Sequence, residues 1–280
     1  MEDLTEIANA AGTDKGTLHN GGHGYTLLYD LLFSHRRLSV TDICEIGLAI
    51  GGPEVPDGSA EREIGNVPSI KMWREYLPNA SVVGVDISDC SAFTSEWFQF
   101  VQADCGDPAQ LDRVAALNRQ FDIILDDGSH ASFHQQLTFL KLFPLLKPGG
   151  IYIVEDMHWQ PDTYEFSLPR VPRTDILFSR FLRKGRFTET GSLPEHDWAE
   201  QARAIKSLHM FDEEWFFRHR QLYNARNNIV PDYASYIDTE TPTIKNIVGR
   251  IIRRVRSEIF NVDSRFIFPK VKIAVIQKAF

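Results

Sequence analysis

The sequence predicts an α/β fold: an open, doubly wound, mostly parallel sheet with helices on both faces and an antiparallel C-terminal strand. Between about residues 41 and 156, short β-rich runs alternate with helix-length segments, which is typical of a parallel sheet with crossover helices. Gly, Pro, Asp or Asn bounds each run. The stretch at 266–280 alternates apolar and polar residues, which predicts an antiparallel strand at the edge of the sheet.

The expected elements follow from these patterns in chain order. Strands are expected at TDICEIGL (41–48), ASVVGVDI (80–87), FQFVQAD (98–104), FDIILDD (121–127) and GIYIVED (150–156). Helices are expected at 25–33, 67–77 and 132–140, and LFPLLKPGG (142–150) predicts a helix with a Pro-Gly-Gly stop before the fifth strand. SLHMFDEEWFFRHR (207–220) fits either a helix or a strand hairpin.

The composition favours one large globular domain, or at most two, and limits the possible partners. The chain has 280 residues, 43% of them hydrophobic, and a formal net charge of -8, which opposes general nucleic-acid binding. Its three cysteines form neither a CxxC pair nor a metal-finger spacing, as expected for reduced thiols. The acidic N-terminus lacks an apolar leader, and no apolar run approaches the roughly 20 residues that cross a bilayer. We therefore expect a cytoplasmic protein without a nucleic-acid partner.

Acidic residues end the first three predicted strands, at the edge where open α/β sheets bind their ligands. The first strand leads into CEIGLAIGG, which places Glu45 and Gly47 in an E-x-G-x-x-x-G-G pattern. This pattern differs from the G-x-G-x-x-G of dinucleotide-binding folds and argues against NAD or FAD. Asp86 ends the second strand, where it can accept hydrogen bonds from ribose hydroxyls. Asp104 ends the third strand, where an adenine amino group can lie. These acids predict a nucleoside site.

Two further strands end in ionisable residues, in the stretches IILDDGSH and GGIYIVEDMH. If these strands are neighbours, their ends lie about 5 Å apart, so Asp127 can face Glu155 and Asp156. Carboxylates that converge so closely raise one another's pKa unless a cation compensates them. Oxygen ligands without cysteine favour Mg²⁺ over zinc. The alternative is that Asp127 only forms a turn with Gly128, while the other two acids are solvated.

The order of these motifs resembles that of class I S-adenosylmethionine-dependent methyltransferases. The pattern E-x-G-x-x-x-G, the acids that end strands two and three, FDIILDD and LLKPGGIYIVED carry the resemblance. GTDKG with HGY, DDGSH and EDMH narrows it to the metal-dependent sugar O-methyltransferases of macrolide biosynthesis, of the macrocin and mycinamicin type. Some relatives of these enzymes carry a cephalosporin-hydroxylase-like label. The resemblance covers roughly residues 12–158.

The resemblance implies a Rossmann-like fold, S-adenosylmethionine (SAM) and Mg²⁺ as cofactors, and methylation of a sugar hydroxyl in a glycosylated natural product, glycan or glycolipid. The residues that would bind SAM are Thr13, Lys15, Glu45, Gly47, Asp86, Asp104 and Asp126. Asp127, Glu155 and Asp156 would hold Mg²⁺, and Tyr25 and His158 would face the acceptor. Composition alone would make GTDKG a surface turn.

His130 is the predicted catalytic residue, because it follows Asp127 by about one turn and can face the same crevice. A sugar hydroxyl is a poor nucleophile, and its proton must leave as the methyl group arrives. Histidine titrates near neutral pH and can accept that proton, especially where a metal ion lowers the pKa of the hydroxyl. Without the resemblance, a cap of the helix expected at 132–140 would be the favoured role of His130. We expect His134 on that helix.

The chain divides into four predicted segments. Residues 1–40 form a loop and helix over the cofactor, 41–158 the SAM-binding core, 159–207 a lid or substrate insertion, and 208–280 the C-terminal strands with a basic amphipathic helix at 243–260. Such a helix most often packs on its own domain, and contact with an anionic membrane or an acidic partner is the alternative. Asp86 follows Glu45 at about twice the usual spacing of roughly 20 residues. Residues 53–66 therefore read as an insertion that contacts substrate or another subunit.

Two other functions compete with methyl transfer. An iron and 2-oxoglutarate hydroxylase is suggested by the label of some relatives, but its facial triad needs two histidines and one carboxylate. No H-x-D or H-x-E occurs in the chain, which argues against this chemistry. A non-catalytic protein that kept the fold is the other alternative, and the intact set of acids with His130 argues against it. We expect a homo-oligomer that acts on a small-molecule glycoside or a glycan.

Overall fold

The computed structural model describes residues 3–19, 22–49, 65–159, 165–229 and 270–280, and in these ranges seven strands form one sheet. In spatial order they are β3 (Phe98–Gln102), β2 (Ser81–Asp86), β1 (Asp42–Ile46), β4 (Phe121–Asp126), β5 (Leu146–Val154), β7 (Val271–Lys278) and β6 (Ile205–Asp212). Neighbours from β3 to β5 are parallel, whereas β7 is antiparallel to β5 and to β6. The predicted mostly parallel sheet is confirmed.

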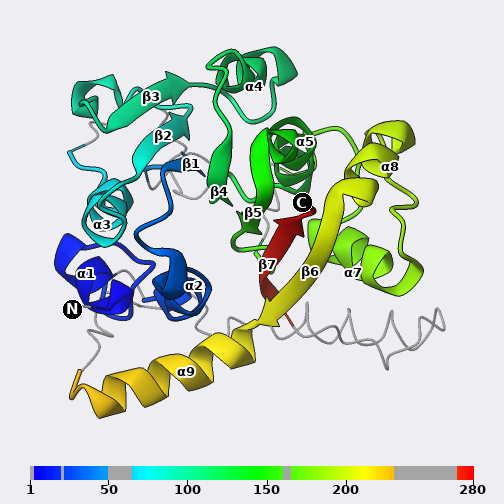
Figure 1. Ribbon diagram of the computed structural model, residues 1–280. Helices are drawn as coiled ribbons and strands as arrows, with labels where there is room; N and C mark the ends of the chain where they lie inside the picture. Colours follow the sequence, from blue (N-terminus) through cyan, green and yellow to red (C-terminus); the bar gives the residue numbers. More distant parts are fainter. Residues whose placement is uncertain (1–2, 20–21, 50–64, 160–164, 230–269) are drawn as a thin grey trace.

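Helices cover both faces of this sheet (Figure 1). One layer contains α1 (Leu4–Ala11), α2 (Tyr25–Phe33), α3 (Pro68–Tyr76) and α9 (Glu213–Arg226), and the other contains α4 (Pro108–Ala115), α5 (Ser132–Leu142), α7 (Thr174–Lys184) and α8 (Glu195–Ala204). Short 3-10 helices occur at η1 (Ser34–Arg36), η3 (Ser91–Phe93) and η4 (Phe143–Leu145). Successive residues of one strand enter opposite cores, as Ile123 and Ile124 of β4 do.

The strand predicted at 266–280 has the expected antiparallel direction, but the prediction that it forms the edge of the sheet was wrong. β7 lies between β5 and β6, and β6 takes the edge. Residues 273–276 form a continuous apolar run that is buried, which is the pattern of a strand covered on both faces. The ambiguous stretch at 207–220 divides at Asp212. Its side chain accepts a hydrogen bond from the Trp215 N–H (2.8 Å), so β6 ends there and α9 begins.

Two local features differ from the predictions. The N-terminal helix α1 was not predicted, although Asp3 and Glu6 form a capping box and Gly12 ends the helix in a left-handed conformation. β5 starts at Leu146, so the expected Pro-Gly-Gly stop lies inside the strand and not before it. In both cases the sequence contains residues typical of the boundary of an element. Strand pairing or helix capping by neighbouring residues determines where that element begins or ends.

The segment 159–207 is more regular than predicted, because α7 and α8 occupy much of it. Each of these helices has only about three turns, so its apolar period is short and does not stand out in the sequence. Phe178 and Trp198 are buried, and the Trp198 ring stacks on Phe139 of α5 at a centroid distance of 5.7 Å. The described part of this segment is therefore packed against α5. Its role as a lid stays a prediction.

Residues 53–64 of the predicted insertion and the whole predicted helix 243–260 lie outside the described residues. In the part of the chain that the structure describes, no helix is both long enough and apolar enough to span a membrane.

Candidate functional site

Acidic residues lie along the sheet edge formed by the carboxyl ends of the parallel strands. In spatial order from β3 to β5 they are Asp104, Asp86, Glu45, Asp126 with Asp127, and Glu155 with Asp156. The strands are parallel, so these ends share one edge, as predicted. The order of the strands reverses at β1, which lies between β2 and β4, and ligands of open α/β sheets bind at such a reversal.

Gly47 brings the ends of β1 and β4 into close contact. Its φ is +83°, and a Cβ at this position would lie 1.8 Å from the carbonyl oxygen of Asp127. The Asp127 N–H donates to the Ile46 carbonyl (2.9 Å) on the same strand end. A side chain at position 47 would therefore displace Asp127, which explains the glycine in the E-x-G pattern.

Asp86 organises the loop that follows β1. Its Oδ2 accepts hydrogen bonds from the backbone N–H groups of Leu48 (2.7 Å) and Ala49 (3.2 Å), and its Oδ1 accepts one from Ser88 (2.7 Å). A carboxylate has about four acceptor positions, so at least one is left for a ribose hydroxyl. The predicted cofactor acid is thus also a structural anchor for Gly47 and its neighbours.

Asp104 is half-buried at the same edge, and Asp126 is buried there. The Asp104 Oδ1 accepts a hydrogen bond from the Gly106 N–H (2.7 Å). Asp126 is buried, and its Oδ2 accepts a hydrogen bond from the Tyr152 hydroxyl (3.2 Å) of β5. Burial raises the pKa of Asp126 to about 7, although the Gly128 N–H and Tyr152 oppose this shift. Contacts of both residues with SAM stay predictions.

The loop that contains Thr13 and Lys15 folds inward, and both side chains are buried. This arrangement differs from the surface turn that composition alone would favour. The Asp14 carbonyl accepts a hydrogen bond from the His23 N–H (2.8 Å), and the Lys15 carbonyl accepts one from the Thr26 N–H (3.0 Å). These contacts hold the loop beside the start of α2.

The Lys15 ammonium lies among carboxylates from three neighbouring strands. Its Nζ is 2.9 Å and 3.1 Å from the two carboxylate oxygens of Glu155, hydrogen-bonds to the Asp127 Oδ2, and is 3.9 Å from the Glu45 Oε1. Burial favours the neutral amine, but Asp127 and Glu155 outweigh it and hold the pKa of Lys15 well above its usual value. Lys15 is therefore a fixed positive charge within this acidic edge.

Glu155 has a second partner that the sequence did not indicate. The Tyr29 hydroxyl of α2 donates a hydrogen bond to the Glu155 Oε1. Glu155 is 1% exposed, and burial together with the negative charge of Asp127 raises its pKa well above the usual value, in spite of Lys15. Tyr29 belongs to an apolar helical run, and no local pattern separates it from the other core residues of that helix.

Asp127, His130 and Asp156 form a candidate metal site. Each offers one ligand atom, and these atoms all lie within 4.8 Å of one another. His130 and Asp156 have left-handed backbones, with φ values of 59° and 50°. Non-glycine residues rarely adopt this conformation, and such strain concentrates at functional sites. Carboxylate oxygens suit Mg²⁺, whereas imidazole suits transition metals, so Asp127 and Asp156 are the candidate Mg²⁺ ligands and His130 lies beside them.

The structure brings together two of the three predicted metal ligands, Asp127 and Asp156, with the predicted base His130. The third predicted ligand, Glu155, contacts Lys15 and Tyr29. The cluster contains one histidine and two carboxylates, whereas the facial triad of an iron hydroxylase contains two histidines and one carboxylate. The geometry thus gives no support to the hydroxylase alternative.

Histidine, lysine and tyrosine side chains surround Asp156. The Tyr25 hydroxyl donates a hydrogen bond to the Asp156 Oδ1, and the His158 Nδ1 is 3.5 Å from the same oxygen. Burial disfavours the carboxylate, but His23, His130 and Lys272 outweigh it and hold the pKa of Asp156 below its usual range. Tyr25 and His158, both predicted to face the acceptor, therefore lie beside a candidate metal ligand.

Lys272 and His23 are site residues that the predictions omitted. The Lys272 Nζ is 2.9 Å from the His23 Nδ1 and 4.7 Å from the centre of the Tyr25 ring. His23 lies in the HGY motif, which gave a signal, but Lys272 lies in β7 with no local motif. Trp159 contacts the other side of the cluster, with its ring 5.5 Å from that of His130, and is 39% exposed.

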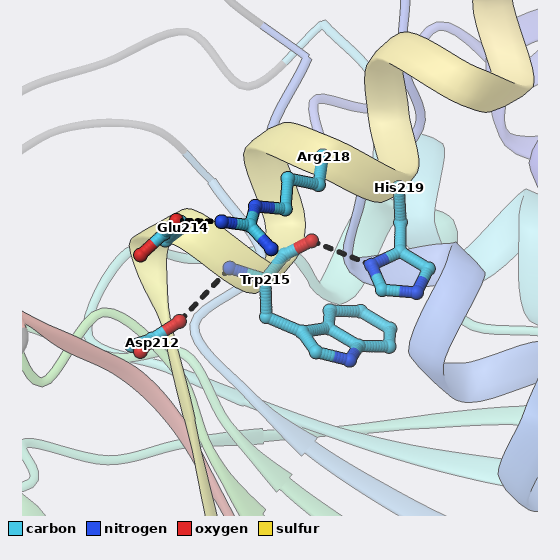
Figure 2. Close-up of a pocket in the computed structure, with 5 residues that line it drawn as sticks. All are labelled: Asp212, Glu214, Trp215, Arg218 and His219. Carbon is cyan, nitrogen blue, oxygen red and sulfur yellow. Dashed lines mark hydrogen bonds and ion pairs between the residues drawn. The ribbon is translucent and has the colours of Figure 1, made fainter.

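A separate hollow of about 240 Å³ lies at the start of α9, lined by Asp212, Glu214, Trp215, Arg218 and His219 (Figure 2). Its charged residues already have partners: Asp212 caps the helix, and Glu214 pairs with Arg218. Figure 2 shows the side chains of Trp215 and His219 from successive turns of α9. Their rings stack, with centroids 3.9 Å apart. None of the predicted site residues lines this hollow.

No model of a known protein family matches the chain. Among curated proteins, mycinamicin VI 2''-O-methyltransferase of Micromonospora griseorubida is 35% identical over 156 residues, which are 55% of this chain and 36% of that protein. The 8-demethyl-8-(2-methoxy-alpha-L-rhamnosyl)-tetracenomycin-C 3'-O-methyltransferase of Streptomyces olivaceus is 37% identical over 155 residues, 55% of this chain and 37% of that protein. Demethylmacrocin O-methyltransferase of Streptomyces fradiae is 35% identical over 156 residues, again 55% of this chain and 36% of that protein.

The comparison with solved structures also finds methyltransferases. The methyltransferase MycE of the mycinamycin pathway, in complex with Mg and SAH, is 30% identical with a TM-score of 0.57, over 75% of this chain and 52% of that chain. A second MycE structure, with Mg, SAH and mycinamycin VI, is 29% identical with a TM-score of 0.56, over 75% and 52%. The chain thus spans about a third of its curated relatives and about half of MycE. The Rossmann-like methyltransferase fold and the resemblance to sugar O-methyltransferases are confirmed.

Proposed function

We propose that this chain transfers a methyl group from SAM to a sugar hydroxyl of a glycosylated small molecule, with the help of Mg²⁺. The observation that supports this most is the grouping of Asp127, His130 and Asp156 beside the reversal of strand order. The relatives that share this fold include an enzyme solved with Mg and SAH. Tyr25, His158 and Trp159 would face the acceptor, because they lie against this cluster.

Each part of the site has a distinct role in this proposal. Asp127 and Asp156 would hold the metal ion, and Glu155 was predicted as a third ligand. When bound, Mg²⁺ supplies a Lewis acid that lowers the pKa of a hydroxyl. His130 would accept the proton of that hydroxyl while its oxygen attacks the methyl group. The sulfonium of SAM becomes the neutral sulfur of S-adenosylhomocysteine (SAH), so the proton on His130 balances the charge.

The SAM contacts follow from the loops at the reversal of strand order. Gly47 keeps the first loop close to Asp127, and Asp86 retains an acceptor for the ribose. Contacts of Thr13, Lys15, Glu45, Asp104 and Asp126 with SAM rest on the resemblance. A cytoplasmic location, a homo-oligomer and peripheral membrane contact through residues 243–260 likewise rest on the sequence alone.

Isothermal titration calorimetry tests the proposal. SAM and SAH should bind with and without Mg²⁺, because the nucleoside and the metal ion would use different residues. Methyl transfer should then be assayed with a panel of glycosides, in the presence of Mg²⁺ or EDTA. EDTA should abolish turnover and leave most of the affinity for SAH. A protein without measurable affinity for SAM or SAH, or one that keeps full activity in EDTA, would contradict the proposal.

A further inference from the structure

One buried lysine joins three neighbouring strand ends of the candidate site. Lys15 contacts Glu155 after β5 and Asp127 after β4 by hydrogen bonds, and lies 3.9 Å from Glu45 of β1. Its side chain is 3% exposed, and those of Glu45 and Glu155 are at most 1% exposed. Asp127 is 19% exposed, but Glu45 and Glu155 are almost without water, and buried acids keep their charges only with a positive charge among them.

The fold fixes the position of this charge. Lys15 follows α1, and the Asn9 side-chain oxygen of that helix accepts hydrogen bonds from the Thr17 N–H (2.8 Å) and the Leu18 N–H (3.1 Å). On the other side, the Gly24 N–H donates to the Gly16 carbonyl (2.7 Å) at the start of α2. The loop backbone is thus tied to two helices, which holds the Lys15 side chain over the acidic strand ends.

Asp127 is shared between this lysine and the candidate metal site. Its Oδ2 accepts a hydrogen bond from Lys15, and its carboxylate also belongs to the group with His130 and Asp156. A carboxylate has two oxygens and can bridge two cations. A metal ion at this group would therefore lie close to a fixed ammonium, and the two positive charges would repel each other.

The acids accept all the hydrogen bonds that the Lys15 ammonium can donate. An ammonium has three N–H donors, and the two oxygens of Glu155 with the Oδ2 of Asp127 account for them. The resemblance implies contact between Lys15 and SAM. A direct hydrogen bond from Lys15 to SAM would have to replace one of these three hydrogen bonds. The structure thus favours an indirect role for Lys15.

We propose that Lys15 is a positioning residue, an internal cation that holds the acidic strand ends together without a metal ion and limits how tightly the Asp127 cluster binds one. This inference rests on the proposed function only in assuming that the cluster binds a divalent cation. It concerns the affinity and the metal dependence of the fold, and both can be measured without SAM or an acceptor.

Lys15→Met tests the proposal, because methionine keeps most of the side-chain length and removes the charge. In EDTA the variant should melt about 6 °C or more below wild type, since it leaves buried acids without their counter-ion. Addition of Mg²⁺ should recover much of this loss, and calorimetry should show Mg²⁺ binding about tenfold tighter or more than in wild type, because a repelling charge is gone.

Lys147→Met is the matched control, because Lys147 bridges the same strands at the opposite end of the sheet. Its Nζ lies 2.8 Å from carboxylate oxygens of both Asp42 and Asp122. This variant should lower the melting temperature equally with and without Mg²⁺ and leave the Mg²⁺ affinity unchanged. The comparison separates the loss of any bridging lysine from the loss of one beside the metal site.

Each outcome of these measurements either supports or overturns the proposal. A melting temperature of Lys15→Met in EDTA equal to that of wild type, or a Mg²⁺ affinity equal to or weaker than that of wild type, would overturn the proposal. If wild type binds no Mg²⁺ but Lys15→Met does, the inference stands and the proposed metal-dependent activity fails. If Lys15→Met folds only with Mg²⁺, the inference is supported. If Lys15→Met does not fold under any condition, the double variant Lys15→Met/Glu155→Gln is compared with the single variant Glu155→Gln. Equal Mg²⁺ affinities of these two variants would overturn the proposal.

Discussion

Replacement of Gly47 by alanine should disturb the candidate site through a single steric contact. The φ of Gly47 is +83°, and the new Cβ would lie 1.8 Å from the Asp127 carbonyl oxygen. The left-handed conformation costs a residue with a side chain about 1–2 kcal/mol. Insertion of a methyl group into a packed region costs about 1–3 kcal/mol more. The free energy of unfolding should therefore fall by about 2–5 kcal/mol, the sum of these ranges.

Gly185→Ala provides the matched control, because Gly185 also has a positive φ of +66° but nothing lies within 4 Å of an added Cβ. It should lose only the backbone contribution of about 1–2 kcal/mol. Urea denaturation followed by tryptophan fluorescence measures both losses, and the excess in Gly47→Ala reports the clash. Mg²⁺ affinity should fall in Gly47→Ala alone, since Asp127 must move. Equal losses of stability in the two variants would refute the view that Asp127 rests in rigid contact with Gly47.

Three further predictions follow from the structure. Asp86→Ala should weaken SAM binding in calorimetry and also lower the free energy of unfolding by about 1–3 kcal/mol, because backbone N–H groups lose their acceptor; unchanged stability would contradict the anchoring role. His130→Ala should lower kcat about 10²-fold while Mg²⁺ affinity in calorimetry is largely kept, as for a general base; a large loss of Mg²⁺ affinity would instead make His130 a ligand. Asp122 is partly buried, which favours the protonated acid, but the hydrogen bond from Lys147 holds its pKa below the usual value. The Asp122 carboxylate therefore stabilises the fold fully above about pH 4. This stabilisation is lost as the pH falls through the lower pKa of the folded state. Asp122→Asn should thus cost about 1 kcal/mol at neutral pH, a value reduced for solvent screening, and the gap in urea denaturation should close in acid; a constant gap would contradict this.

The parallel half of the sheet was predictable because its signals are local. Each of the first five strands is a short apolar run bounded by turn residues, and the structure has a strand in each of those runs. The place of β7 was not predictable in this way. β7 is an inner strand because it pairs with β6, which lies about 60 residues earlier in the chain, and the periodicity of a sequence carries no information on pairing partners.

The candidate site was likewise predictable only where its residues lie in local motifs. Asp127, His130 and Asp156 stand in short motifs at strand ends, and the resemblance to a known family was needed to select them over turn and capping roles. Lys272 was missed because it approaches the cluster from a strand remote in the sequence. The role of Lys15 was predicted as contact with SAM, and the structure gives it carboxylate partners that a loop motif cannot reveal.

The inner position of β7 also determines when the protein can finish folding. β5 ends at Val154 and β7 begins at Val271, so β5 keeps an unpaired edge while the residues between them are synthesised. The contact between Lys272 and His23 joins residues 249 positions apart and can form only after β7 has been synthesised. β6 has no partner until then, because it pairs with β7 alone among the described strands. The exposed edge of β5 is thus where aggregation would begin if translation stalled before β7.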